Sequence, residues 1–375
     1  MLTKEQAYIL SLLRESLNTK QSSLSELVDK QTVVDIILRN SILLTVYHKL
    51  PDDLKTQLKS KYSSNVSQSV VQEYEGERVL KALGDIGLKC IPLKGWELRK
   101  LYPDSTMRQM ADLDILVQPY IFGQIKNEME KLGFTGGSEN NWKHNSFMKK
   151  TIHVEMHKRL TDDSRLIQTW ENGLWDRATA VEGNICNMSP EDFYIFHFVH
   201  LHKDFLNGSL GLRRIVDTWL LQKRSDVDMK QVEYWLESFR MWKFHEQMVK
   251  LSRVTMGELP MDEEMEVLLK HAFAHGIYGS GKSYKAGRIA AMGSSLKGGK
   301  VKSIVSAVFL PYGRMKAQFP VLERFPVLLP YCWGKRILRM MKGNKEKYRK
   351  MLDYSDVSKA DYKEMKRIFE AGGVY

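Results

Sequence analysis

Asp112-Leu113-Asp114-Ile115-Leu116-Val117 has the pattern of a buried β-strand with an acidic rim. Side chains alternate between the two faces of a strand, so Asp112 and Asp114 point to one side while Leu113, Ile115 and Val117 point into a core. Two carboxylates about 7 Å apart on one face repel each other unless a cation lies between them. Mg²⁺ is the cation that we expect there, because it prefers oxygen ligands.

A second strand is predicted upstream, from Leu88 to Leu93, and it is followed by Lys94-Gly95 and a short helix. The backbone N–H groups at this turn can bind phosphate oxygens, because a helix N-terminus attracts anions and glycine allows a close approach. Lys94 is a candidate phosphate ligand. Arg108 is another, because it lies in the loop that leads into the acidic strand.

A predicted hairpin places a third carboxylate near this pair. Residues 142–148 and 151–157 read as two strands, and the second alternates apolar and polar side chains with Glu155 on the polar face. Glu155 can complete a metal site and favour deprotonation of an attacking hydroxyl, which is the arrangement that nucleotidyl or phosphoryl transfer requires. In the alternative interpretation, the two aspartates are solvated acids and Glu155 pairs with Lys143 or Lys149.

These residues resemble a known family in their order along the chain. The chain is similar to the uncharacterised bacterial nucleotidyltransferases of the DNA polymerase β superfamily. The residues that carry this resemblance are Leu93-Lys94-Gly95, Tyr102, Arg108, Asp112–Val117, His153–His157, His200, Arg213–Asp217 and Phe325–Arg336. The resemblance covers most of the chain. It implies Mg²⁺- or Mn²⁺-dependent transfer of a nucleoside monophosphate from an NTP to an acceptor, with release of pyrophosphate.

By the same resemblance, Asp112 and Asp114 match the metal-binding pair, Glu155 the third acid, and Lys94 with Gly95 the glycine turn. Two features depart from the family pattern. The turn is Lys-Gly rather than Gly-Ser or Gly-Gly, and the third acid is Glu where many members have Asp.

The expected fold is α+β, with a small mixed β-sheet nucleotidyltransferase core flanked by N-terminal and C-terminal helical lobes. We expect an N-terminal helical lobe over residues 1–86 and the nucleotidyltransferase core over 87–160. A second helical lobe is expected over 161–275 and a basic C-terminal region over 276–375.

The net charge of +12 is unevenly distributed over the 375 residues. Residues 278–350 contain 17 lysines or arginines but only Glu323 and Glu346 as acids, so the rest of the chain is close to neutral. Such a region indicates an anionic partner or a solvated basic face. The alternative function is therefore a catalytically silent scaffold or binding protein whose basic region docks on a membrane or on nucleic acid.

The sequence also bears on location and on the acceptor. The three cysteines are widely spaced and do not form a disulfide or zinc pattern. Neither a signal peptide nor a transmembrane segment is predicted. Both observations favour a cytoplasmic protein, and peripheral contact with a membrane stays open. The acceptor remains open between a small molecule, a sugar, a peptide, a protein and RNA.

Two further groups of residues have competing interpretations. Arg213 and Asp217 either line the nucleotide-binding cleft or form an intrahelical ion pair at i, i+4. His197, His200 and His202 are expected to be packed or to face the substrate rather than to bind metal, because no cysteine or acid stands at ligand spacing.

Residues 276–283 match the P-loop pattern G-x-x-x-x-G-K-[ST]. A P-loop requires a buried strand before it, whereas residues 265–273 read as an amphipathic helix. We therefore expect a basic loop here, with a P-loop ATPase or kinase as the lesser alternative.

Overall fold

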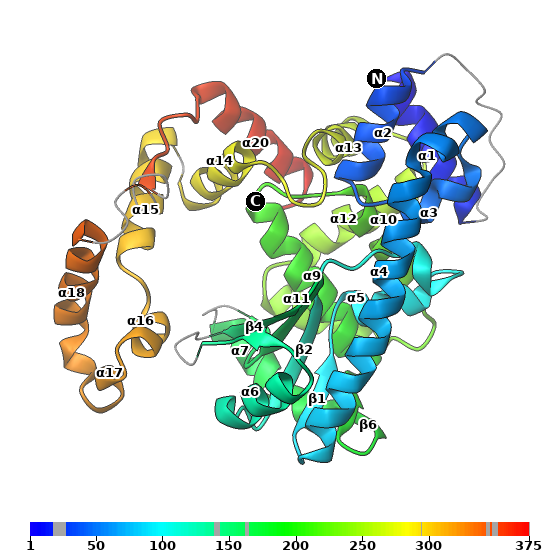
Figure 1. The fold of residues 1–375 in the computed structure, drawn as a ribbon. Helices are drawn as coiled ribbons and strands as arrows, with labels where there is room; N and C mark the ends of the chain where they lie inside the picture. Colours follow the sequence, from blue (N-terminus) through cyan, green and yellow to red (C-terminus); the bar gives the residue numbers. More distant parts are fainter. Residues whose placement is uncertain are drawn as a thin grey trace.

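The computed structural model describes residues 1–17, 28–138, 143–161, 165–293, 295–342, 346 and 352–374. It confirms the predicted α+β fold, in which one mixed sheet is flanked by helices (Figure 1). In the described part of the chain, seven strands pair in the order β3-β4-β5-β2-β1-β7-β6. They are β1 (Lys89–Pro92), β2 (Leu113–Gln118), β3 (Thr135–Gly136), β4 (His144–Lys149), β5 (Ile152–His157), β6 (Thr179–Glu182) and β7 (Ile185–Asn187).

The helices form three groups along the chain. Those that precede or surround the sheet are α1 (Lys4–Ser16), α2 (Lys30–Arg39), α3 (Leu43–Val46), α4 (Asp52–Asp85), α5 (Gly95–Leu98), α6 (Phe122–Lys131), α7 (Arg165–Asn172) and α8 (Leu174–Arg177). The bundle that follows contains α9 (Pro190–Leu206), α10 (Leu212–Leu221), α11 (Met229–Ser238), α12 (Trp242–Thr255) and α13 (Glu263–His275). The last group is α14 (Gly281–Met292), α15 (Leu296–Val308), α16 (Tyr312–Gln318), α17 (Val321–Arg324), α18 (Leu329–Lys342) and α20 (Lys359–Ala371).

Strand β2 holds the acidic rim between two neighbours. It runs antiparallel to β1 and parallel to β5, and the register with β5 places Asp114 opposite Glu155. The strand begins at Leu113, so Asp112 is the residue immediately before it. The predicted hairpin is β4 and β5. Lys149 still pairs with Ile152, so the turn is formed by Lys150 and Thr151, one residue later than the predicted Lys149 and Lys150. Trp142, at the predicted start of the first strand, lies outside the described residues.

The two faces of the sheet pack against different helices. On one face, Leu113, Ile115 and Val117 share a core with side chains of α4 and α6. On the other face, Leu116 belongs to the larger core formed with the helical bundle. Asp114 points the same way as Leu116 because alternate residues share a face, so the acidic rim faces the bundle.

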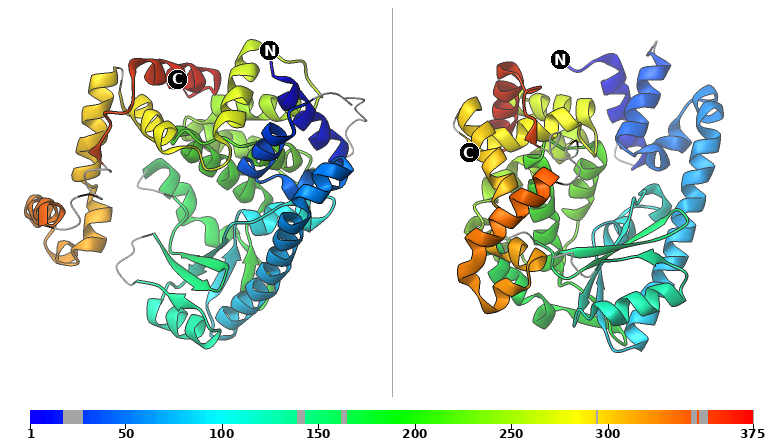
Figure 2. Two further views of the ribbon diagram at one scale, coloured as in Figure 1. Left: turned by 45° about the horizontal axis from the view of Figure 1, so that its top comes forward. Right: turned by 60° about the vertical axis from the view of Figure 1, so that its left-hand side comes forward.

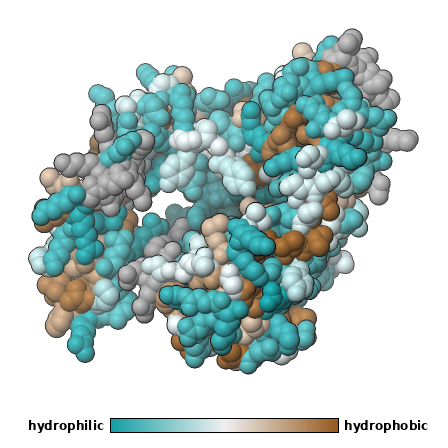
Figure 3. All heavy atoms as spheres, in the orientation of Figure 1, coloured by the Kyte–Doolittle hydropathy of each residue, from teal (hydrophilic) through white to brown (hydrophobic). Residues whose placement is uncertain are grey.

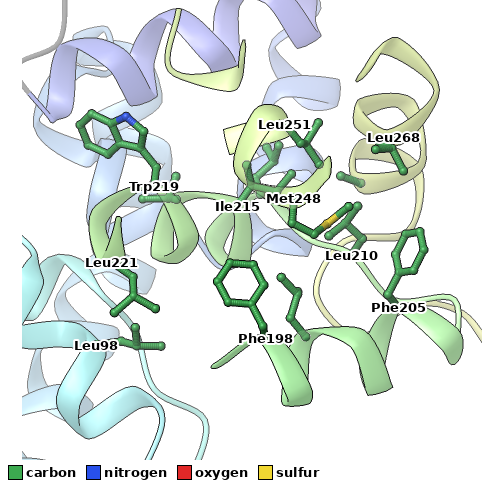
Figure 4. Close-up of a cluster of buried hydrophobic side chains, with 14 of the residues drawn as sticks. Leu98, Phe198, Phe205, Leu210, Ile215, Trp219, Leu221, Met248, Leu251 and Leu268 are labelled. Carbon is green, nitrogen blue, oxygen red and sulfur yellow. The ribbon is translucent and has the colours of Figure 1, made fainter. Parts of the chain in front are cut away.

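The bundle and the N-terminal helices share that larger core, which includes Ile9 and Leu13 of α1. Figure 4 shows part of it, with Phe198 of α9, Ile215 of α10 and Met248 of α12 in one cluster. Helix α9 begins directly after Ser189, which caps the helix by accepting a hydrogen bond from the Asp192 N–H.

The strand pair β6 and β7 was not predicted. It extends the sheet beyond β1, because β7 pairs in parallel with β1 through Cys90 and Ile185. All four residues of β6 are exposed, so this strand lacks the apolar alternation that predicts a half-buried strand.

Helices α15 to α18, residues 296–342, form an arm that stands away from the rest of the molecule (Figure 1 and the left view of Figure 2). The arm has a small core of its own, made of Met315, Phe319, Leu322 and Cys332. Figure 3 shows an opening between the arm and the body, and both hydrophilic and hydrophobic side chains on the arm. No helix in the described residues is both long enough and apolar enough to span a membrane.

Candidate active site

A cavity of about 240 Å³ lies between the acidic rim of the sheet and helices α9 and α10. It brings together seven residues that the sequence analysis proposed for the site, namely Lys94, Gly95, Arg108, Asp112, Asp114, Arg213 and Asp217. Glu155, the third proposed acid, does not line this cavity but lies next to it on β5. The site is therefore assembled from a turn, two strands and a helix that are distant in sequence.

Asp114 is a deeply buried acid of the site. Only 2% of its surface is exposed, so it is not a solvated strand-end acid. Its Oδ1 accepts hydrogen bonds from Lys94 Nζ at 2.8 Å and from His157 Nε2 at 2.7 Å. Burial alone would raise the pKa of Asp114, but the positive charge of Lys94 and the hydrogen bond from His157 outweigh it and hold this pKa far below its usual value.

Asp112 and Glu155 approach each other from neighbouring strands. Together with His153 they form a group whose candidate ligand atoms lie within 4.8 Å of one another. Burial, followed by the negative charge of Asp114, raises the pKa of Asp112, although Lys94 partly offsets both. An acid with a raised pKa beside two others indicates a local shortage of positive charge.

Two histidines that the sequence analysis left out of the site surround Glu155. His157 Nε2 lies 3.4 Å from Glu155 Oε2, and His144 Nε2 lies 3.6 Å from Glu155 Oε1. Burial lowers the pKa of His157, but its hydrogen bonds to Asp114 and Glu155 reverse that effect and raise it. The alternation of β5 gives a signal for His157, because His157 shares the polar face with Glu155. Lys149, suggested as a partner of Glu155, instead pairs with Glu75 at 2.7 Å.

The turn at Lys94 and Gly95 has an unusual backbone. Lys94 adopts φ +44°, a region that L-residues rarely occupy, and directly precedes helix α5. A Cβ atom on Gly95 would lie 2.7 Å from Arg108 Nη1 and 2.9 Å from Met110 Cγ. Gly95 is therefore required for the close approach of the turn to the cavity wall.

Arg108 and Asp217 form a buried pair that spans the site. Arg108 Nε and Nη2 donate to the two carboxylate oxygens of Asp217 at 2.7 and 2.8 Å, and Tyr102 Oη donates to Oδ1 at 2.9 Å. The sequence offered an intrahelical ion pair between Arg213 and Asp217 as one interpretation. In the structure the bidentate partner of Asp217 is instead Arg108. Both residues of the pair line the cavity.

Arg213 is buried at 8% exposure and also lines the cavity. Its Nη1 donates to the Gln109 carbonyl at 2.6 Å, whereas its Nε has no hydrogen-bond partner among the described residues. Burial and the nearby Arg108 charge lower the pKa of Arg213 to about 10, so it stays positive at neutral pH. A buried cation with an unused donor beside a cavity fits an anionic ligand.

Helix α9 contributes groups from the opposite wall. His197 hydrogen-bonds to Thr218 at 2.8 Å, and His200 Nδ1 lies 3.0 Å from Asp204 Oδ2. Burial lowers the pKa of both histidines to about 4, so both are neutral at pH 7. Asp204 was missed in the sequence, although its i, i+4 spacing from His200 was a usable signal.

The segment that resembles a P-loop has a different structure. Helix α13 precedes it, as expected, and Ser280 begins α14 with a capping box. Lys282 pairs with Asp361 at 2.9 Å on the surface. Two residues of the segment, Ile277 and Tyr278, line the cavity, a contact that the pattern did not predict.

The acidic group fits a hard divalent cation. Asp112 and Glu155 offer carboxylate oxygens and His153 a ring nitrogen, all within the span of one ion. A cation there would also neutralise the acids that raise the pKa of Asp112. These residues can therefore hold a metal beside the cavity.

Comparison with known proteins identifies the family. The model of a family described as an uncharacterised nucleotidyltransferase matches residues 18–257, well over half of the chain. This range includes the acidic rim, β5 and most of the cavity. No curated protein and no solved structure matches the chain. The chain therefore belongs to this family of uncharacterised nucleotidyltransferases.

Proposed function

We propose that the protein transfers a nucleoside monophosphate from an NTP to a hydroxyl or phosphate acceptor and releases pyrophosphate, in a site that requires Mg²⁺ or Mn²⁺. The observation that carries this proposal is the convergence of acids beside a cavity with buried cations. Asp112 and Glu155 share one group of candidate ligand atoms with His153, and Asp114 lies opposite Glu155 in the strand register. Kinship with the DNA polymerase β superfamily is part of the same proposal.

The roles of the residues follow from their positions. Asp112, Asp114 and Glu155 hold the divalent cation, which neutralises charge on the triphosphate and on the leaving pyrophosphate. The backbone at Lys94 and Gly95 binds phosphate oxygens, because the turn lies at the start of α5 and lines the cavity.

Arg108, Arg213 and Asp217 form the remaining wall of the nucleotide site. Arg213 donates its unused Nε to a phosphate oxygen. Arg108 contributes charge and is held in place by Asp217, which takes two of its three guanidinium nitrogens. Asp217 thus acts on the nucleotide through Arg108.

With a hydroxyl acceptor, the transfer step forms one bond at the α-phosphorus and breaks another. The acceptor oxygen forms a bond to the α-phosphorus, and the bond from that phosphorus to the pyrophosphate oxygen breaks. Pyrophosphate leaves with the electron pair of the broken bond, and the hydroxyl proton passes to the Glu155 carboxylate.

Substitution of the aspartate pair tests this function. We expect Asp112→Asn with Asp114→Asn to abolish metal-dependent NTP binding and turnover, measured by calorimetry and by release of labelled pyrophosphate with each NTP and a panel of acceptors. Circular dichroism should show an intact fold. Asp85→Asn with Asp226→Asn, both exposed, is the matched control. Unchanged turnover in the first variant would refute the proposal.

We also propose that the protein is cytoplasmic and that its arm docks on an anionic membrane surface. Helix α18 exposes Tyr331 (58%), Leu338 (55%) and Met341 (63%) at spacings that share one helix face. Lys335 lies on this face, 4.9 Å from the Tyr331 ring centre, and Lys342 follows at its end. Apolar residues flanked by lysines on a helix are typical of binding at a lipid interface.

Vesicle sedimentation tests this docking. Wild-type protein should co-sediment with phosphatidylglycerol-containing vesicles and not with pure phosphatidylcholine vesicles. Leu338→Asp with Met341→Asp should remain in the supernatant, whereas Val181→Asp, an equally exposed position on β6, should behave as wild type. Binding to duplex DNA or RNA without binding to vesicles would assign the arm to nucleic acid instead.

A further inference from the structure

A second cavity, of about 650 Å³, lies beside helix α9 at the junction between the body and the arm. Its walls come from α9, from α14 and from the arm residues Ser306, Pro311 and Arg314. It shares Phe196 and His200 with the first cavity, so both cavities border the same two side chains of α9. A molecule bound in the second cavity therefore lies next to the nucleotide site.

The lining of the second cavity combines apolar surface with positive charge. Its apolar residues include Leu160, Ile167, Val199, Leu206, Phe239 and Met241. Lys203, Arg288 and Arg314 supply the cations, and the described lining contains no Asp or Glu. Pockets of this composition select a ligand with an apolar body and a small number of matched polar groups, here anionic ones.

Arg288 is held in a fixed position on the cavity wall. Its Nη2 donates to Ser306 Oγ at 3.1 Å and its Nη1 to Tyr284 Oη at 3.3 Å, and both partners also line the cavity. Because these partners are neutral hydroxyls, they orient the guanidinium without cancelling its charge. Such a group is ready for a phosphate or carboxylate.

His200 stands at the junction of the two cavities with a defined orientation. Asp204 is an acceptor, so His200 Nδ1 carries the proton that points to it, and Nε2 of the neutral ring is an acceptor. A hydroxyl that passes from the second cavity toward the nucleotide site can donate to Nε2.

We propose that the second cavity binds the acceptor and that the acceptor is an amphiphilic anion, with an apolar or aromatic body and a phosphate or carboxylate group. The anionic group binds at Arg288, and the end that receives the nucleotide reaches past His200 into the first cavity. This inference rests on the proposed nucleotidyl transfer.

Calorimetric titration with 2-naphthyl phosphate, 2-naphthoate and the neutral 2-naphthyl glucoside tests the cavity directly. An ATP analogue with a methylene bridge between the α- and β-phosphates is present with Mg²⁺, so that the first cavity is filled and no transfer occurs. At least one of the two anions should bind, and the glucoside should not. Preference between the two anions identifies the acceptor's charged group.

Variants then locate the binding. Arg288→Gln should weaken binding of the anion about tenfold or more, as expected for loss of a charge-assisted hydrogen bond. Ala291→Trp, at an exposed lining position, should remove binding by filling the cavity. Arg367→Gln, on the surface of α20, is the matched control and should bind as wild type. Equal binding by all three variants, or no anion binding by the wild type, would overturn the proposal.

The proposed transfer and this inference can fail separately. Asp112→Asn with Asp114→Asn should still bind the naphthyl anion in the absence of nucleotide, even though it has no turnover. In wild-type protein with labelled ATP, the bound anion should compete with other acceptors without becoming labelled, because its naphthyl ring carries no hydroxyl that could receive the nucleotide. Transfer that proceeds unaffected by saturating naphthyl anion would show that the cavity binds something other than the acceptor.

Discussion

Arg108 and Asp217 are 109 residues apart in sequence and join the loop before β2 to helix α10 through two parallel hydrogen bonds of 2.7 and 2.8 Å. Both side chains are almost completely buried, with 7% and 2% of their surfaces exposed. The pair fixes the distance between the acidic rim and the helix that carries Arg213. Together with the hydrogen bond from Arg213 to the Gln109 carbonyl, this ion pair connects the sheet side of the proposed nucleotide site to the bundle.

Removal of the charge from this pair should destabilise the protein. Asp217→Asn leaves Arg108 as a buried cation without its carboxylate, which costs roughly 3 to 5 kcal/mol in comparable buried pairs. Urea unfolding should show this loss in the free energy of unfolding. Asp226→Asn breaks an exposed pair with Arg224 and should change the stability little. Equal stability of the two variants would mean that the buried pair contributes no more to stability than an exposed one.

A methyl group at Gly95 should displace the turn that we propose to bind phosphate. In Gly95→Ala the new Cβ would lie 2.7 Å from Arg108 Nη1 and 2.9 Å from Met110 Cγ, so the turn or the cavity wall must move. We expect NTP affinity to fall at least tenfold, measured by calorimetry. Gly123→Ala is the matched control, because its Cβ would meet nothing within 4 Å in helix α6. Wild-type affinity in Gly95→Ala would show that the close approach is unnecessary.

The sequence predicted the parts of the site that depend on local pattern. The alternation around Leu113 placed the acidic rim on the correct face, and the alternation of β5 placed Glu155 beside it. The partner of Asp217 could not be predicted in this way, because helical periodicity compares a residue only with its own helix. Register between strands likewise determines which histidines reach Glu155. Strand β6 was missed because all its side chains are exposed, so its sequence does not show the alternation of apolar and polar residues that predicts a half-buried strand.

The lysine of the P-loop pattern should be dispensable for nucleotide turnover. Lys282 is half-exposed and pairs with Asp361, and the element before it is a helix rather than a buried strand. Lys282→Ala should therefore turn over NTP as wild type. Lys94→Ala, which removes the cation beside Asp114, should lose most of the activity in the same pyrophosphate-release assay. A loss of turnover in Lys282→Ala would favour the P-loop interpretation.

Buried histidines should make the protein sensitive to mild acid. His245 is a core residue of α12 that is hydrogen-bonded to Tyr194, and burial lowers its pKa to about 4. Burial also lowers the pKa values of His197, His200, His202 and His271. An unfolded histidine has a pKa near 6.5, so between about pH 6.5 and 4 the unfolded state binds protons that the folded state excludes. Stability is complete above this range and falls as the pH decreases through it.

His245→Gln isolates the contribution of one such group. Replacing the imidazole with a neutral amide should make the fall in unfolding free energy from pH 6.5 to 4 smaller by about 3 kcal/mol. Urea unfolding at intervals over this range measures the slope. His48→Gln, at an exposed histidine near Tyr62, should retain the wild-type slope. If His245→Gln also retained it, protonation of this buried ring would not be a cause of the acid sensitivity, and the loss of stability would have to come from other groups.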